Sequence, residues 1–251
     1  MLIMIATDGP STRAVYNSLR EEHGEFPIII EDKTSLKVLL RNRVKKLGWF
    51  RTASQLAFMI FNRFVLERVY NRRVTEIIDQ TGLDLSPLPT HAVRSVSSIN
   101  SPEAIALIQS YDPKVIVVNG TRIISRAVLG SSPAVFINTH AGITPAYRGV
   151  HGGYWARYQG DLDRCGVTVH LVDSSVDTGP IVAQANIVPT GKDAFPTYPY
   201  LQIAAALPLL RSAVQDALDG TIQAKPSTGD SRQWYHPGIV EYLLGVCRNV
   251  R

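Results

Sequence analysis

Asn138 and His140 close a strongly apolar run that begins at Ala134, and their residue types could act on an acyl group. An apolar run that stops at polar, glycine- and proline-containing residues is typical of a buried strand whose last residues emerge into a crevice. Side chains two positions apart on a strand point the same way, so Asn138 and His140 are expected to share one face. An amide can stabilise an oxyanion, and an imidazole can accept a proton. The pair therefore indicates acyl-group chemistry.

The turn after the first expected strand, Leu2–Ala6, could bind an anion. Gly9, Ser11 and Thr12 lie where a helix should begin. Amides and hydroxyls at a helix start can hold a phosphate. The turn has a single glycine and not the GxGxxG pattern, so a dinucleotide fingerprint is absent. An ordinary strand-to-helix turn capped by Ser11 or Thr12 is the alternative, and both interpretations stay open.

Two later strand ends also carry residues suited to a binding site. The strand expected at 115–118 is followed by Gly120, and glycine permits a ligand to approach the backbone closely. The strand expected at 167–172 opens into a polar loop with two carboxylates, Asp173 and Asp177. These ends are further candidates for the walls of a ligand site.

The elements that must position these residues alternate between strands and helices. This order predicts a Rossmann-like three-layer α/β domain with a mostly parallel sheet. Ligands of such sheets bind beyond the carboxyl ends of the strands. We expect a catalytic domain over 1–220, with a basic helical insertion over 33–81, and a C-terminal extension over 221–251. Strands are expected at 2–6, 26–30, 115–118, 134–140, 167–172 and 181–188, and helices from about 11, across 33–81, from 102, around 153 and over 200–218.

Composition places the chain among ordinary globular proteins, with 251 residues, 45% of them hydrophobic and 19% charged. No segment approaches the roughly 20 apolar residues that span a bilayer, and the apolar start is too short for a signal-peptide core. The two cysteines, Cys165 and Cys247, are too few for a disulfide framework. We therefore expect a cytoplasmic enzyme, with a peripheral membrane association left open.

The other histidines give weaker signals. His23, His91 and His236 show no metal-ligand spacing, so no metal site is predicted. His170 lies in the middle of an expected strand, where a hydrogen-bonded structural histidine is the expectation.

Positive charge is concentrated in one segment. From Lys33 to Arg73 there are eleven Lys or Arg and only one acidic residue, Glu67, a net charge of +10 in a chain whose total is +5. One interpretation is a basic amphipathic surface for anionic lipid or a phosphorylated substrate. The favoured interpretation is a helical insertion packed on the domain with its charges solvated. Its apolar residues recur at largely helical spacings: Leu36, Leu39, Leu40, Leu47, Leu56, Ile60 and Phe64.

Residues around the acyl-chemistry pair complete a longer motif. They are Asn138, His140, Pro145, the Arg148-Gly149 step and the turn from Val176 to Pro180 with Asp177 inside it. In this order they resemble the folate-dependent formyltransferases, which include glycinamide ribonucleotide, methionyl-tRNA and sugar N-formyltransferases. The resemblance covers about 115–188 well and the first strand loosely.

The resemblance implies that N10-formyltetrahydrofolate donates its formyl group to a primary amine, with no metal. Asn138 would hydrogen-bond the oxyanion, and His140 would handle the proton that the amine loses. Asp177 would orient His140 and favour its protonated form.

The resemblance also implies binding residues. The pterin would lie against the backbone around Arg122, Ile123 and Ile124 and against the loop that includes Asp173 and Val176. The acceptor is expected near Gly9, Ser11, Thr12, Tyr147, Arg148 and His151.

The expected acceptor is an amino sugar on a nucleotide carrier, as in surface polysaccharide (lipopolysaccharide or O-antigen) synthesis. The tRNA-directed relatives carry a further C-terminal β-barrel, whereas about 30 residues follow Gly220 here. The hydrolase of the family carries an N-terminal regulatory domain, whereas the first expected strand here begins at Leu2. The purine-pathway enzyme lacks a cationic helical insertion such as the one expected here over 33–81. Tyr147-Arg148-Gly149 and Trp155 look more like the tRNA and sugar branches.

Several alternatives stay open. A formyltetrahydrofolate hydrolase would use the same three residues to activate water. Another small amine such as glycinamide ribonucleotide could also be the acceptor. A folate- or anion-binding module is the non-enzymatic alternative, but it predicts a damaged set of catalytic residues. No nucleic-acid partner is expected. Membrane contact through Lys33–Arg73, a homodimer, and a nucleotide, dimer or sheet-covering role for 231–237 are left open.

Overall fold

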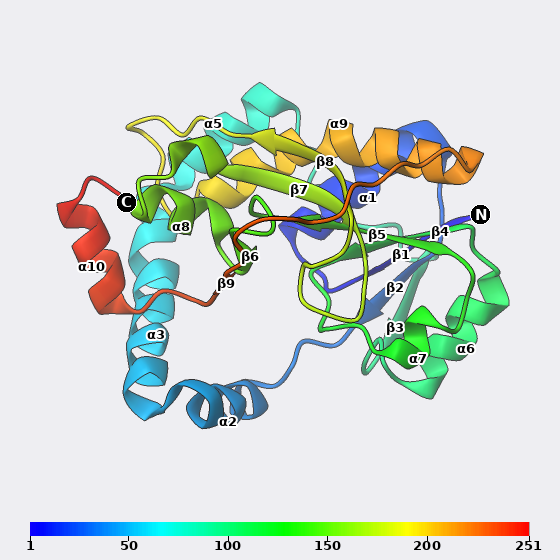
Figure 1. The fold of residues 1–251 in the computed structure, drawn as a ribbon, viewed down its shortest axis with the longest axis horizontal. Coiled ribbons are helices and arrows are strands. Elements are labelled where there is room, and N and C mark those ends of the chain that lie inside the picture. The colour runs from blue at the N-terminus through cyan, green and yellow to red at the C-terminus, as the bar shows by residue number, and fades with distance from the viewer. Residues whose placement is uncertain (251) are drawn as a thin grey trace.

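A seven-stranded sheet forms the centre of the protein, with helices on both of its faces (Figure 1). The computed structural model describes residues 1–250. The strand order is β3-β2-β1-β4-β5-β7-β8, and a separate two-stranded sheet pairs β6 with β9. The strands are β1 Leu2–Ala6, β2 Ile28–Glu31, β3 Val93–Val96, β4 Val115–Asn119, β5 Val135–His140, β6 Arg148–Gly149, β7 Gly166–Leu171, β8 Ile181–Asn186 and β9 Gln233–Trp234. The helices are α1 Pro10–His23, α2 Leu36–Leu47, α3 Trp49–Phe61, the π-helix η1 Asn62–Leu66, α4 Glu67–Val69, α5 Asn71–Thr81, α6 Pro102–Tyr111, α7 Arg126–Leu129, α8 Gly152–Tyr158, the 3₁₀-helix η2 Leu162–Arg164, α9 Tyr198–Asp219 and α10 Ile239–Cys247.

The sheet changes direction beside the strand that carries Asn138 and His140. Strands β3, β2, β1, β4 and β5 pair in parallel, whereas β7 is antiparallel to β5 and β8 is antiparallel to β7. In this register Asn138 pairs with His170, which brings two polar side chains together in the middle of the sheet. The α/β class and the mostly parallel sheet predicted from the sequence are confirmed.

The sequence pattern does not predict β3. Its four residues, Val93–Val96, include an exposed arginine and an exposed serine, and it lies at the sheet edge beside β2. An edge strand this short has no apolar run to distinguish it from a loop. The other six strands of the seven-stranded sheet lie within two residues of their predicted bounds.

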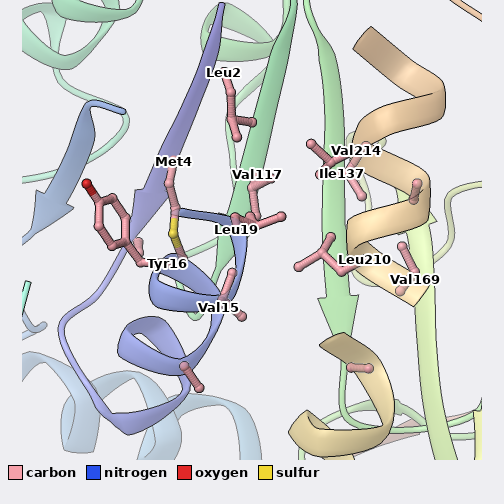
Figure 2. Close-up of a cluster of buried hydrophobic side chains, with 14 of the residues drawn as sticks. Leu2, Met4, Val15, Tyr16, Leu19, Val117, Ile137, Val169, Leu210 and Val214 are labelled. Atoms are coloured by element: carbon pink, nitrogen blue, oxygen red, sulfur yellow. The ribbon is translucent and has the colours of Figure 1, made fainter. Parts of the chain in front are cut away.

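Alternate residues of β1 bury both faces of the sheet. Leu2 and Met4 pack toward α1 and α9, in the cluster shown in Figure 2. Ile3 and Ile5 pack on the opposite face against α6, where Ile108 is fully buried. A strand covered on both sides is apolar throughout, which explains its uninterrupted hydrophobic sequence. The result is a rigid frame for the loops at the strand ends.

The basic insertion is helical from α2 to α5, and most of it packs on the domain. Phe58 of α3 is fully buried, and its ring lies 4.8 Å from that of Phe195 and 4.9 Å from that of Tyr242 on α10. Arg73 of α5 pairs with Asp193 at 2.7 Å. The packed interpretation therefore fits α3 to α5, whereas α2 has no buried residue.

The C-terminal segment returns to the strand that follows the predicted site. β9 pairs with β6, and the Trp234 indole donates a hydrogen bond to the Ala146 carbonyl at 3.0 Å. The Trp234 ring stacks on Tyr147 at 5.7 Å and on Trp155 at 4.8 Å. This aromatic packing anchors residues 145–150 from the outside.

Candidate active site

A cavity of about 360 Å³ lies where β4 and β5 end. The three residues expected to be catalytic, Asn138, His140 and Asp177, all line it. So do the residues expected to bind the cofactor: Arg122, Ile123, Ile124, Asp173 and Val176. Residues from three separate strand ends thus meet at one cavity, as in the ligand sites of other α/β sheets.

His140 is held by protein groups at both ring nitrogens. Its Nδ1 lies 3.3 Å from Asp177 Oδ2, and the ring is 6% exposed. Its Nε2 donates to the Tyr147 carbonyl at 2.7 Å, because a carbonyl oxygen can only accept. The proton on Nε2 is therefore fixed, and Nδ1 is the nitrogen that gains or loses a proton beside Asp177.

Burial sets the resting charge of His140, whereas hydrogen bonds and neighbouring charge set that of Asp177. Burial lowers the pKa of His140, and the Asp177 carboxylate and the Tyr147 carbonyl offset this only in part. Burial raises the pKa of Asp177, but contact with His170, the charge of His140 and the Gly149 amide outweigh it, so the pKa is lowered. At neutral pH the ring is therefore neutral and the carboxylate ionised. Asp177 favours the imidazolium, as the resemblance implies, but burial is the larger influence.

His170 fixes the amide of Asn138. The Asn138 amide nitrogen can only donate, so His170 Nε2 accepts from it at 3.0 Å, and His170 Nδ1 donates to the Leu171 carbonyl at 2.8 Å. The bond to His170 uses one of the two amide protons of Asn138 and leaves the other for a ligand. His170 Nε2 also lies 3.7 Å from Asp177 Oδ1. The histidine expected to be structural therefore touches two of the residues expected to be catalytic.

The loop that carries Asp177 is held from β6. The Gly149 amide donates to Asp177 Oδ2 at 2.9 Å, and the Arg148 guanidinium donates to the Val176 carbonyl at 2.7 Å. Gly149 has φ +98°, and a side chain there would collide with the Trp234 carbonyl, so only glycine fits. Asp177 itself has φ 49°, a left-handed conformation that is uncommon outside glycine and that clusters at functional sites.

Tyr147 and Arg148, expected near the acceptor, line neither this cavity nor the larger one described below. The Tyr147 side chain is buried and its hydroxyl donates to Asp161 at 2.9 Å, so only its carbonyl reaches His140. Arg148 also donates to the Ser231 hydroxyl at 2.9 Å. Both residues brace the site through these contacts with neighbouring segments.

A larger cavity, of about 740 Å³, adjoins the first along the chain: Val150 lines the smaller one and His151 the larger. His151 Nε2 lies 3.0 Å from His236 Nε2. Burial lowers the pKa of both rings, that of His236 to about 4, so both are neutral at pH 7. The insertion supplies one wall through Met59, Asn62, Arg63, Glu67, Asn71 and Val74.

The turn after β1 has some features of an anion-binding turn and some of an ordinary strand-to-helix turn. Ser11 lines the larger cavity, whereas Gly9 and Thr12 line neither. Thr12 is buried, donates to the Thr7 carbonyl at 2.6 Å and accepts from the Asn119 amide at 2.9 Å. No side chain caps α1, which leaves its first amides for another partner.

Glu31 is a site-supporting residue that the sequence reasoning does not single out. It is 3% exposed, and its carboxylate accepts from the backbone amides of Arg122 at 2.6 Å and of Ile99 at 3.0 Å. The Arg122 guanidinium neutralises it at 2.6 Å. The sequence carries one signal for such a role, a carboxylate at the end of the otherwise apolar strand β2. Glu31 thereby fixes the start of the 122–124 segment at the smaller cavity.

No metal-binding group is present in the part of the chain that the structure describes, since no three His, Cys, Asp or Glu side chains lie close enough to hold an ion. His91 instead pairs with Glu25 at 2.6 Å on the surface. None of the helices over 1–250 is long and apolar enough to cross a membrane.

The fold and the residues at its smaller cavity define a Rossmann-like domain equipped for acyl-group chemistry. The chain belongs to the formyl transferase family, whose profile matches residues 1–195. Over 107 residues it is 37% identical to a methionyl-tRNA formyltransferase of Chlorobium chlorochromatii, a match that covers 43% of this chain and 32% of that protein. The chain spans less than half the length of such curated relatives, between 28% and 46%.

Solved structures share the fold. A sugar N-formyltransferase from a Shewanella species has a TM-score of 0.58 at 15% identity, covering 93% of this chain and 76% of that one. A formyltransferase from Anoxybacillus kamchatkensis, solved with UDP-4,6-dideoxy-4-formamido-L-AltNAc and tetrahydrofolate, has a TM-score of 0.52 at 15% identity, covering 93% and 85%. Glycinamide ribonucleotide transformylase 1 from Symbiobacterium toebii has a TM-score of 0.57 at 17% identity, covering 91% and 94%. At these identities the likeness is one of fold.

Proposed function

We propose that this protein is a folate-dependent N-formyltransferase that moves a formyl group from N10-formyltetrahydrofolate to a primary amine of a nucleotide-linked amino sugar. One observation carries the proposal: Asn138, His140 and Asp177 meet at one cavity in a member of the formyl transferase family. The family supplies the reaction class, and the cavity supplies the three groups that such a reaction needs.

The chemistry assigns one role to each group. The amine lone pair attacks the formyl carbon of the co-substrate and generates a tetrahedral oxyanion. The second amide proton of Asn138, the one not bonded to His170, stabilises that oxyanion. The proton lost by the amine is taken up at Nδ1 of neutral His140, and ionised Asp177, 3.3 Å away, stabilises the imidazolium. Collapse of the intermediate breaks the bond to the folate nitrogen, which takes up a proton, and leaves the formamide.

The smaller cavity is proposed as the folate site. Its volume of about 360 Å³ lies in the range of small-molecule pockets. Backbone around Arg122 to Ile124 and the loop with Asp173 and Val176 line it next to the catalytic groups. Tetrahydrofolate in the Anoxybacillus relative supports this co-substrate for the shared fold.

The larger cavity is proposed as the acceptor site. Consecutive residues, Val150 and His151, line the smaller and the larger cavity respectively, and this supports an acceptor in the larger cavity that extends its amine toward the formyl carbon. Ser11 and the uncapped amides of α1 are suited to a phosphate, and Arg63 of the insertion adds a cation in the same cavity. The UDP-linked formamido sugar in the Anoxybacillus relative supports a nucleotide sugar as the class of acceptor.

A direct test is incubation of the protein with N10-formyltetrahydrofolate and a panel of nucleotide-linked amino sugars, followed by mass spectrometry. We expect one sugar to gain a formyl group, with tetrahydrofolate released in equal amount. Release of tetrahydrofolate without any acceptor would favour a hydrolase instead. Transfer to glycinamide ribonucleotide but to no sugar would keep the reaction class and overturn the acceptor.

A further inference from the structure

We propose that α2 and the corner joining it to α3 dock this protein on an anionic lipid surface. Among the helices of eight or more residues that the structure describes, α2 is the one with no buried residue. Figure 1 shows it at the outer edge of the molecule, attached to the domain through α3. A twelve-residue helix that buries none of its residues has an apolar face without a full partner in this chain.

The exposed surface of this segment is strongly apolar. Leu36 and Val44, which share a helix face at eight residues' separation, are 58% and 44% exposed. At the corner Trp49 and Phe50 are 62% and 73% exposed, and their rings stack on each other at 3.6 Å. Large neighbouring apolar side chains in water mark an interaction surface rather than a solvated face.

Positive charge surrounds the same surface. Residues 33–52 contain seven Lys or Arg and no acidic residue. Three of these cations are engaged within the chain: Arg43 turns to Met59 at 3.2 Å, Arg51 pairs with Glu241 at 3.6 Å, and Lys46 lies over Tyr235. The other four have no ion pair among residues 1–250: Lys33, Lys37, Arg41 and Lys45.

The charge and the apolar exposure together indicate which kind of partner binds this surface. A second copy of the chain, placed symmetrically on this face, would bring these four cations without an ion pair against the same four of its partner. A nucleic acid would satisfy the cations but leave Leu36 and Val44 in water. An anionic bilayer surface satisfies both, since an interfacial helix sinks its apolar side into the acyl boundary while its cations meet head groups. The Trp49-Phe50 corner suits the same boundary, where aromatic rings gather.

Docking can be measured apart from chemistry, because neither Trp49 nor Phe50 lines the two cavities. The chain has three tryptophans, and the other two, Trp155 and Trp234, are 4% and 8% exposed. Tryptophan fluorescence therefore reports on the corner itself.

The test is co-sedimentation of the full chain with phosphatidylcholine vesicles, with and without phosphatidylglycerol, at physiological ionic strength. We expect binding only with the anionic lipid, a blue shift of the fluorescence on binding, and loss of binding in high salt. Lys37→Glu with Lys45→Glu should lower the partition coefficient by at least about tenfold. Trp49→Ser with Phe50→Ser should abolish binding, whereas Trp49→Phe should keep binding but lose the blue shift.

Lys114→Glu with Lys192→Glu is the matched control, because these exposed lysines lie outside the insertion and change the net charge equally. It should bind vesicles like the wild type, and formyl transfer without lipid should be unchanged in all these variants. If the control variant lost vesicle binding to the same extent, net charge alone would explain the effect, and the proposal would be overturned. RNA binding without lipid binding would also overturn it, as would self-association that the Trp49→Ser, Phe50→Ser variant abolishes without any lipid binding.

Discussion

The two adjoining cavities are built in different ways. The smaller one is bounded by strand ends, and its polar groups are held by the sheet and by β6, as in the bonds from Tyr147 to His140 and from His170 to Asn138. The larger one is walled by the insertion and the C-terminal segment, whose side chains come from distant parts of the chain. Buried polar atoms without a hydrogen-bond partner within residues 1–250 occur at both cavities: Thr139 Oγ1 at the smaller one, and Asn62 Oδ1 and His236 Nδ1 at the larger one.

This difference suits the smaller cavity to the chemical step and the larger cavity to recognition of the acceptor. Groups that must stabilise charge during a reaction work best when they are already fixed, because they then need no reorganisation. Unpartnered buried polar atoms are costly, and a bound molecule that supplies the missing partner removes that cost. Under the proposed function, changes at the smaller cavity should lower the rate, and changes at the larger one should weaken acceptor binding.

The largest effect is expected for Asn138→Ala. Loss of the oxyanion donor should lower kcat by about 10²–10³, with little change in the KM of either substrate. Steady-state kinetics would measure this, and circular dichroism would confirm the fold. Asn186→Ala is the matched control, since that amide bonds the Asp163 carbonyl outside both cavities. Near-normal turnover of Asn138→Ala would remove the smaller cavity from the chemistry.

A smaller effect with a pH signature is expected for Asp177→Asn. Burial lowers the pKa of His140, and Asp177 acts against that by raising it. The wild-type rate should therefore fall on the acid side only below the usual histidine range, as His140 becomes protonated. Without the carboxylate the pKa falls further, so the acid limb should move to lower pH while kcat drops by roughly 10- to 100-fold. A limb that moves to higher pH would contradict the assignment of His140 as the proton acceptor.

The sequence could predict the smaller cavity far better than the larger one. Asn138 and His140 lie on one strand, so period two alone places them together, and the motif resemblance adds Asp177. The role of His170 could not be foreseen, because it depends on the antiparallel register that pairs it with Asn138.

Helical periodicity also has a limit that the insertion makes clear. It indicates that α2 and α3 each have an apolar face, but not what covers that face. Phe58 of α3 meets Phe195 and Tyr242, residues more than a hundred positions away, while Leu36 of α2 meets nothing comparable. Long-range packing of this kind is absent from any local pattern, and the walls of the larger cavity depend on it.

The smallest effect on rate, and the sharpest contrast between the cavities, is expected for Arg63→Ala. Arg63 lies in the insertion wall and pairs with Glu67 at 2.7 Å, and a hydrogen bond from a charged group to a bound acceptor contributes about 1.5–3 kcal/mol. The acceptor KM should rise about tenfold or more, while kcat and the KM for N10-formyltetrahydrofolate stay near wild type. The matched control is Arg72→Ala, which removes a 92% exposed guanidinium that pairs with Glu76 outside the cavity. If both variants behave alike, or if Arg63→Ala lowers kcat instead, the insertion does not form the acceptor wall and the division between the two cavities fails.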